Sequence, residues 1–357
     1  MIKVVELEGS YYQIGQGWGE ALREDMPKII QIELGTVAAL LGVDIKTVVA
    51  IGSSYLEVAE KYDPDFMQVL KGFSQGAEVD FNTFFAIRAV LEILFQTSRP
   101  EGMCTSFAVT GEATASGETI IGQNIDWHPE LPLVLLRINW PNGVQQLSLT
   151  LGGVFEYSLS HHPSYEPYAG AATLTATSNS RPGQPTVPVS IVMQKAYRQA
   201  NIDKALAEFA ASELNIASFL LADGAGNISG IELGAGTHVL LSSPKGTLVH
   251  ANHYQSDLFV PKDIFLPYVP DSPLRQARLT KLIDENYGNI TVDHMKRFLA
   301  DHENYPKAIC AHVDPKSELP PSATVGSVIM VPARKMMYVA AGTPCSNDYI
   351  PFDMNNE

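Results

Sequence analysis

The sequence predicts an α+β fold in which helical and strand-forming segments are layered, not strictly alternating. Residues 15–98 show the three- and four-residue apolar spacing of amphipathic helices. Beyond Pro100 the chain consists mainly of short runs rich in β-branched residues, separated by Gly, Pro or Asn. Helical segments return between these runs, but without the regular βαβ order that builds a parallel sheet.

Helical spacing occurs in the N-terminal third and again later in the chain. The runs 44–62 and 80–97 open on Asp44 and Asp80, whose carboxylates can accept hydrogen bonds from the first helical turn. Ser272, which is followed by proline, is a favourable helix start because proline is tolerated in the first turn. The other helices are expected within 15–42, 191–212, 271–288 and 292–302.

The strand-like runs are short and bounded by turn residues. They lie at 105–111, 118–125, 133–140, 144–151, 217–224, 227–233, 238–243 and 247–253, with two more strands over 327–342. The glycine-rich stretch 224–230 lacks the GxGxxG spacing of a nucleotide-binding loop and opens no helix. It is therefore expected to be a hairpin turn.

Composition and charge exclude several classes of function. The 357 residues are 45% hydrophobic and 18% charged, which is typical of a soluble globular chain with a sizeable core. The formal net charge of −15 argues against nucleic-acid and membrane partners. The N-terminal residues lack the features of a secretory signal, so a cytoplasmic protein is expected.

No metal ion or cofactor is expected from the histidine and cysteine spacings. His250 and His253 are three apart in a predicted strand, so their side chains should point to opposite faces. The neighbouring pair at 161–162 is likewise assigned no metal, and chelators are expected to leave activity intact. Cys310 and Cys345 fit no zinc or disulfide framework and are expected to be free core or surface thiols.

The remaining cysteine, Cys104, stands at the start of a predicted hairpin. The runs 105–111 and 118–125 flank the turn sequence Glu-Ala-Thr-Ala-Ser-Gly, whose centre is near residue 115. Residues equidistant from the turn of an antiparallel pair lie opposite one another, so Asp126 is expected beside Cys104. A carboxylate there would raise the thiol pKa, but it suits a neighbouring cation such as a newly formed α-amino group.

Several short motifs, in order, resemble one enzyme family. They are Cys-Thr-Ser at 104–106, Gly-Gln-Asn-Ile-Asp at 122–126, Asn-His at 252–253, Glu-Asn-Tyr-Pro-Lys-Ala-Ile-Cys at 303–310 and Gly-Thr-Pro at 342–344. Together they are similar to the acyl-coenzyme A:6-aminopenicillanic acid acyltransferase (isopenicillin N acyltransferase) family of N-terminal-nucleophile hydrolases. The resemblance covers essentially the whole chain and implies a four-layer αββα sandwich.

The resemblance also implies autocatalytic cleavage between Met103 and Cys104. An α chain of residues 1–103 and a β chain of residues 104–357 would then stay associated as one integrated domain. The new α-amino group has a reference pKa of about 7.7–8.0, so it could serve as the base for its own thiol.

Further roles follow from the resemblance at matching positions. Asp126 would hold the Cys104 ammonium group, and Asn252 would donate its side-chain amide to the oxyanion. Ser106 falls where the family has a hydroxyl that assists cleavage. Trp127 would form a wall of the substrate pocket, whereas the adjacent histidine is assigned no role.

The expected reaction is hydrolysis of a small N-acyl amide through an acyl-enzyme on Cys104. One alternative is transfer of an acyl group from acyl-CoA, as co-substrate, to an amine; another is an uncleaved, non-catalytic binding protein. Glu318 stands where the penicillin enzyme has an arginine, which disfavours an anionic acyl-CoA donor. Met103 replaces the glycine that precedes the nucleophile in that enzyme, and its bulk could slow cleavage.

Overall fold

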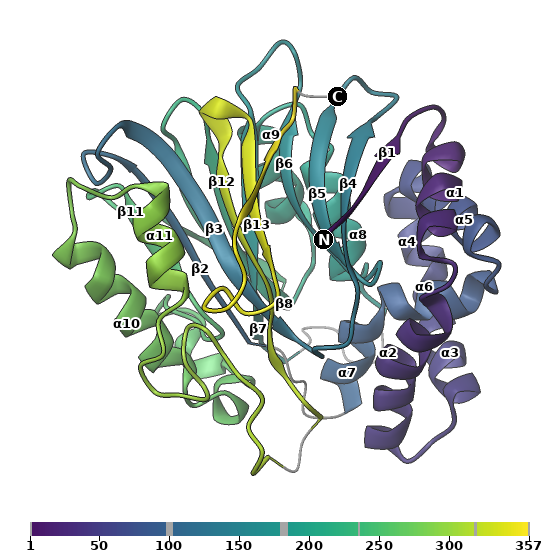
Figure 1. Ribbon diagram of the computed structural model, residues 1–357. Coiled ribbons are helices and arrows are strands. Elements are labelled where there is room, and N and C mark those ends of the chain that lie inside the picture. Colours follow the sequence, from purple (N-terminus) through teal and green to yellow (C-terminus); the bar gives the residue numbers. More distant parts are fainter. Residues whose placement is uncertain (1, 98–102, 179–184, 235, 318–319, 356–357) are drawn as a thin grey trace.

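Two β-sheets pack face to face between layers of helices, which confirms the predicted αββα sandwich (Figure 1). The computed structural model describes residues 2–97, 103–178, 185–234, 236–317 and 320–355. Strands of the two sheets contact each other at the centre of the molecule, where β2 and β3 face β7 and β8. The space between the sheets is therefore the place where inward-facing side chains of both sheets meet.

The first sheet has eight strands in the order β1-β4-β5-β6-β7-β8-β9-β10. Their bounds are β1 Lys3–Leu7, β4 Leu133–Asn139, β5 Gln145–Leu151, β6 Phe155–His161, β7 Tyr168–Ala176, β8 Ile216–Asp223, β9 Ile228–Gly234 and β10 Thr237–Leu241. Neighbours pair antiparallel except at the edge, where β1 runs parallel to β4. The N-terminal segment thus supplies an edge strand to a sheet whose other strands follow residue 130.

The second sheet has six strands in the order β11-β2-β3-β12-β13-β14, all antiparallel. Their bounds are β2 Met103–Gly111, β3 Gly117–Trp127, β11 Thr247–His250, β12 Ala323–Val331, β13 Met336–Ala341 and β14 Ile350–Asp353. Side chains alternate along β2, so Phe107 and Val109 join the apolar cluster with Leu279 and Ile283 of the covering helix. Cys104, an odd number of residues from both, points the other way, between the sheets.

Helices cover the outer faces of both sheets. Helices α8 (Val189–Tyr197) and α9 (Ile202–Ala211) contact the eight-stranded sheet, and α10 (Ser272–Glu285) and α11 (Val292–Leu299) contact the six-stranded sheet (Figure 1). The N-terminal helices form a further group beside them. Their bounds are α1 Tyr11–Leu22, α2 Met26–Leu41, α3 Ile45–Ser53, α4 Leu56–Tyr62, α5 Pro64–Ala77, α6 Phe81–Arg88 and α7 Val90–Thr97.

Glycines allow α1 and α5 to pack backbone against backbone. A Cβ added at Gly15 would lie 1.9 Å from the Val69 carbonyl oxygen, and one added at Gly72 would lie 2.0 Å from that of Tyr12. Any larger side chain would therefore push the helices apart. This close packing anchors the N-terminal helical group, which includes α2 and α7. Residues of these two helices line the hollows described below.

Most of the predicted elements are present, with local differences. Asp44 and Asp80 cap α3 and α6 as expected, each accepting a hydrogen bond from a backbone N–H in the first turn. The predicted helical run 15–42 is split at residues 23–25, of which Arg23 and Glu24 are exposed, into α1 and α2, and α1 already begins at Tyr11. Strands β1, β6, β7 and β14 were not expected: β1 and β14 are short, and β6 and β7 mix small, aromatic and polar residues without a clear period.

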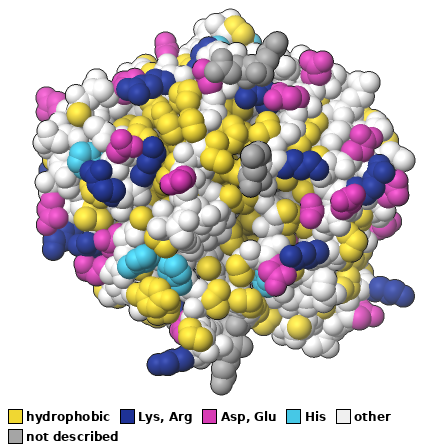
Figure 2. Space-filling view, in the orientation of Figure 1, with side chains coloured by type: hydrophobic (Ala, Val, Ile, Leu, Met, Phe, Trp, Pro, Cys, Tyr) yellow, Lys and Arg dark blue, Asp and Glu magenta, His cyan; other side chains and the backbone are white. Residues whose placement is uncertain are grey.

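The surface view shows charged side chains of both signs scattered among hydrophobic ones (Figure 2). Within the described part of the chain, no single helix has the length and apolar composition needed to cross a membrane. Helices α2 and α3 meet that criterion only as a pair, bent by 97°.

Candidate functional site

Cys104 lies one residue from the start of β2, paired with β3. Its partner across the ladder is Ile125, and Asp126 lies opposite Met103. The predicted pairing of Cys104 with Asp126 is therefore shifted by one residue. The cause is the position of the turn: Gly111 lies opposite Gly117, so the turn is centred at residue 114 and not at 115, and the register slip between Val109 and Gly111 compensates only part of this difference.

The Asp126 carboxyl is buried beside Cys104. Thr324 Oγ1 donates to its Oδ1 at 2.5 Å, while Oδ2 has no hydrogen-bond partner among the described residues. Burial raises the pKa of Asp126 to about 7, although the charge of Arg275 and the bond from Thr324 act in the opposite direction. An acceptor atom without a partner at this depth is suited to a donor such as an ammonium group.

The Cys104 thiol is only 5% exposed and is not activated in the uncut chain. Burial raises its pKa to about 12, and the charge of Asp126 raises it further, whereas the Asp126 backbone N–H lowers it. A thiol with this pKa stays protonated near neutral pH and is a weak nucleophile. Fast attack by this sulfur therefore needs a further base, because the titratable group beside it among the described residues is Asp126, whose charge opposes formation of the thiolate.

The peptide groups on both sides of Cys104 are held by side chains. Its N–H donates to Asn252 Oδ1 at 2.6 Å, and its carbonyl oxygen accepts from Arg275 Nη1 at 2.7 Å. The nitrogen that cleavage would convert into an α-amino group is thus already bound by a buried acceptor. This arrangement fixes the position of Cys104 independently of its thiol.

Asn252 lies just after β11, and its amide orientation is set by its neighbours. Arg275 Nη2 faces its Oδ1 at 3.0 Å, and because arginine can only donate, the facing atom must be the oxygen. The amide nitrogen donates to the Leu174 carbonyl at 3.0 Å, which occupies one of its two N–H groups. Asn252 therefore holds the Cys104 nitrogen, and its second N–H is the group available for an oxyanion.

Arg275 is a site residue that the sequence reasoning missed. It is 1% exposed on α10, where its Nε donates to Asp271 at 2.8 Å and its Nη1 donates to Thr105 Oγ1 at 2.8 Å. The one sequence signal is the (i, i+4) pair of opposite charges, which is also common on exposed helices. Here the pair is buried, so it fixes Arg275 between Cys104, Asn252 and the helix.

Ser106 and the two histidines near Asn252 have structural partners. Ser106 Oγ donates to the His250 carbonyl at 3.1 Å. His250 contacts Thr173 through Nδ1 and Glu232 through Nε2, and His253 Nδ1 contacts the Ser272 hydroxyl. The two imidazoles thus face different hydrogen-bond partners. Ser106 lies two residues after Cys104, whose carbonyl oxygen is bound by Arg275.

An apolar pocket opens next to Cys104 between the two sheets. Its lining combines strands of both sheets with α7 and α8: Leu91, Cys104, Ile125, Asp126, Trp127, Phe155, Tyr157, Ala172, Thr173, Leu174, Val189, Met193 and Ala217. Its volume of about 20 Å³ exceeds the roughly 10–15 Å³ that one water molecule needs. Asp126, Cys104 and Tyr157 supply the ionisable groups of this lining.

Trp127 separates this pocket from a second hollow. Its indole N–H donates to Glu33 Oε1 at 2.8 Å, and burial raises the pKa of Glu33 to about 7. The second hollow has a volume of about 50 Å³ and is lined by Ile32, Glu33, Thr36, Val37, Leu40, Val90, Leu94, Trp127, His128, Pro320, Pro321 and Ser322. Trp127 is thus a wall of both spaces, and His128, without a predicted role, lines the second.

Two residues singled out in the sequence cannot be compared with the structure. Glu318, the residue that replaces an arginine of the penicillin enzyme, lies outside the described residues, and the side chain of Met103 is not described. The glycine-rich stretch 224–230 does form the turn that joins β8 to β9, as predicted.

Comparisons with known proteins complete this description. No protein-family model and no curated sequence matches the chain. Two variants of a conjugated bile acid hydrolase from Clostridium perfringens are similar at 12% and 15% identity, with TM-scores of 0.46 and 0.48. Penicillin V acylase from Agrobacterium tumefaciens is similar at 12% identity, with a TM-score of 0.45. Each match covers 71% of this chain, and 93%, 93% and 87% of the respective structures.

Proposed function

We propose that the protein is an N-terminal-nucleophile amidohydrolase that cleaves itself before Cys104 and then hydrolyses a small N-acyl amide. The observation that supports this proposal is a pair of features in the surroundings of Cys104. Its nitrogen is bound by Asn252, while the carboxylate beside it has an oxygen without a partner among the described residues. Both features suit an α-amino group that does not yet exist in the intact chain.

Cleavage proceeds in two balanced steps. The Cys104 sulfur attacks the Met103 carbonyl carbon, the C–N bond breaks, and the thiol proton ends on the Cys104 nitrogen. Water then hydrolyses the thioester, leaving a carboxylate on Met103 and a free thiol. Arg275 and Asn252 hold the two ends of Cys104 throughout, which keeps the sulfur close to the bond that it attacks.

The freed amine supplies the base that the uncut site lacks. It takes the thiol proton, the sulfur attacks the substrate carbonyl, and the leaving amine departs with a proton. Water resolves the acyl-enzyme. The unpartnered Asp126 oxygen accepts a hydrogen bond from the ammonium form, and the second N–H of Asn252 donates to the oxyanion.

The lining of the pocket favours an apolar acyl group. Phe155, Leu174 and Met193 surround the sulfur, and burying an apolar group against such side chains is worth about 25 cal/mol per Å². The second hollow carries Glu33, a carboxyl that suits a neutral or cationic amine portion. No cofactor takes part, and the partners of this reaction are the small amide and the two fragments of the chain itself.

Mass spectrometry of the intact protein tests the proposal. Purified wild-type chain should give two fragments divided between Met103 and Cys104, whereas Cys104→Ala should give one full-length chain without activity. A panel of apolar N-acyl amides and acyl-CoA thioesters should then add the mass of the acyl group to the Cys104 fragment. Cleavage at another bond, or turnover by an uncut chain, would contradict the mechanism.

The ratio of hydrolysis to transfer separates the two enzymatic readings. On one cleaved preparation, kcat/KM for amide hydrolysis should exceed that for acyl-CoA-dependent transfer onto an amine. Transfer that is faster by tenfold, about 1.4 kcal/mol, would make the protein an acyltransferase.

A further inference from the structure

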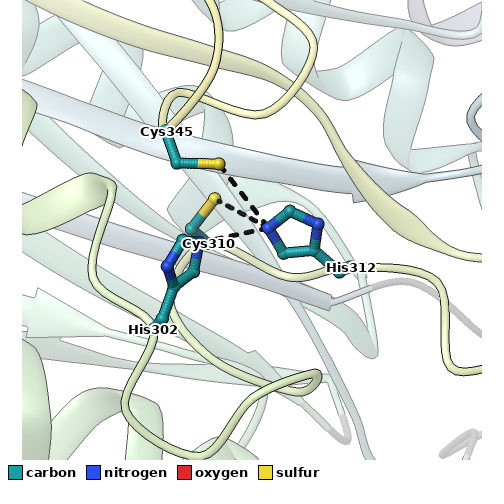
Figure 3. A group of neighbouring side chains, drawn as sticks. All are labelled: His302, Cys310, His312 and Cys345. Carbon is teal, nitrogen blue, oxygen red and sulfur yellow. Dashed lines mark hydrogen bonds between the residues drawn. The ribbon is translucent and has the colours of Figure 1, made fainter.

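Four side chains, none of which lines the Cys104 pocket, converge on one point (Figure 3). His302 follows α11, Cys310 and His312 lie on the next segment, and Cys345 lies in the loop between β13 and β14. One nitrogen or sulfur atom of each lies within 4.8 Å of the corresponding atom of every other. Three regions of the chain thus bring two imidazoles and two thiols to one point.

Hydrogen bonding alone does not account for this arrangement. His312 Nε2 lies 3.1 Å from His302 Nε2, 3.7 Å from Cys310 Sγ and 3.6 Å from Cys345 Sγ. A neutral imidazole nitrogen has either one proton or one lone pair, so it cannot satisfy three neighbours. The convergence of the four nitrogen and sulfur atoms on one point indicates a ligand that each of them contacts.

The spacings agree with a tetrahedral metal centre. With Zn–N and Zn–S bonds of typical length, tetrahedral geometry places two nitrogens about 3.3 Å apart and a nitrogen and a sulfur about 3.6 Å apart. The observed separations are 3.1 Å for the nitrogen pair and 3.6 and 3.7 Å for the nitrogen–sulfur pairs. We propose that His302, Cys310, His312 and Cys345 bind one Zn²⁺ ion.

The chemistry of the donors selects zinc and a structural role. Two thiolates with two imidazoles form a Cys₂His₂ set, which closes the coordination shell and leaves no position for a reacting water. Binding releases the two thiol protons to solvent, so no oxidant or reductant is needed. Cys310 is buried, whereas His302 and Cys345 are exposed, which gives the ion an entry path.

The proposed ion stabilises the segment that supports Asp126. Ala311, between two of the ligands, donates its N–H to Thr324 Oγ1 at 2.9 Å, and its carbonyl accepts the Thr324 N–H at 3.0 Å. Thr324 Oγ1 in turn donates to Asp126. Zinc therefore acts as a positioning element: it holds residues 310–312 in the arrangement that orients Thr324 toward the carboxylate.

A zinc site here departs from the expectation of no metal, which rested on the spacing of His250 and His253 and on cysteine spacings that fit no zinc framework. Those residues lie near Asn252 and have other partners. The four residues proposed here have no recognisable sequence spacing, because Cys345 is brought to the others by the β12–β13 hairpin.

The test uses untagged full-length protein expressed with zinc in the medium and dialysed against metal-free buffer. Elemental analysis should find one zinc ion per chain. Replacement by Co²⁺ should give thiolate-to-cobalt charge-transfer absorption and the visible bands of a tetrahedral site. Cys310→Ser and Cys345→Ser should lose both signals, whereas His238→Ala, at an exposed histidine elsewhere, and Cys104→Ala should keep them.

Three results would overturn the proposal. They are a zinc-free protein that takes up no Co²⁺, metal binding that survives both serine substitutions, and a Cys310–Cys345 disulfide in protein purified under reducing conditions. Because Cys104→Ala is inactive but should retain zinc, failure of the metal site and failure of the proposed amidohydrolase function are distinguishable.

Discussion

The surroundings of Cys104 and of the Cys310–Cys345 pair give the same side chain two different chemistries. Cys104 is buried among apolar groups with a carboxylate beside it, and the nearest cation, Arg275, is bound to its carbonyl oxygen. Cys310 and Cys345 instead face a shared imidazole nitrogen close to the surface. The surroundings of Cys104 suit a thiol that loses its proton only after cleavage has formed its α-amino group. The surroundings of Cys310 and Cys345 suit thiolates held by a metal ion.

The difference shows that cysteine chemistry is set by which donors and charges the fold brings to the sulfur. A carboxylate and burial together raise the Cys104 pKa to about 12. Neither effect prevents function if the missing base is generated by cleavage. The four experiments below test this contrast, from the largest expected effect to the smallest.

Arg275→Ala should cause the largest loss of stability. It would leave the Asp271 carboxylate without its buried partner, a change that costs about 3–5 kcal/mol in comparable pairs. Arg278→Ala, on the same helix but with more exposed partners, should cost about 0–1 kcal/mol. Urea unfolding should be measured in the uncut Cys104→Ala chain, and equal losses for both variants would contradict a special role for Arg275.

Asp126→Asn should fold but lower kcat by about a hundredfold or more, the effect of removing one key electrostatic group from an active site. The reason is that an amide cannot compensate the charge of the Cys104 ammonium group. Circular dichroism should show an unchanged fold, and steady-state kinetics should show the loss. Kinetics like those of the wild type would reduce Asp126 to a structural residue at a strand end.

Stability of the uncut Cys104→Ala chain should fall as pH rises from about 4 to about 7. The folded pKa of Asp126 is raised above its unfolded value, so the native state binds more protons in this range. Asp126→Asn should remove up to about 1.4 kcal/mol per pH unit from the slope. Asp44→Asn is the matched control: hydrogen bonds from Thr47 lower the Asp44 pKa, so this slope should not change.

Alkylation rates should separate the two thiol environments in the cleaved, zinc-loaded enzyme. Iodoacetamide should modify Cys104 in parallel with loss of activity, while zinc protects Cys310 and Cys345. After treatment with a chelator, Cys345 should react as well, since it is exposed. Peptide mass spectrometry can follow each site, and equal Cys345 modification with and without zinc would contradict a metal bound there.

Much of this architecture was predictable because it depends on local patterns. Alternating apolar residues and turn glycines define the β2–β3 hairpin, and the hairpin brings Asp126 near Cys104 to within one residue. The α10 helix was likewise expected, but its buried arginine was not. The local difference between Arg275 and Arg278 is the (i, i+4) partner Asp271, which does not predict burial, since burial depends on how α10 lies against β2 and β11.

Contacts between residues that are far apart in the chain could not be predicted from the sequence. Cys345 joins His302 and His312 through the packing of two loops, and Glu33 reaches Trp127 from a helix far away in the chain. The spacing of these residues carries no signal, because no single helix or strand contains them. Contacts of this kind appear only when the sheets and their covering helices are assembled.

If the chain cleaves itself as proposed, the parallel pairing of β1 with β4 changes the reaction order of refolding. Before the cut, β1 belongs to the same molecule as its partner strand, so refolding is a first-order process. After the cut, the strand is supplied by a second molecule, and recovery from denaturant becomes second order in protein concentration. Dilution should therefore slow recovery of the cleaved protein but not of the Cys104→Ala chain. Under the proposed mechanism, each molecule can fold as a single chain only once, before the cleavage that makes it active.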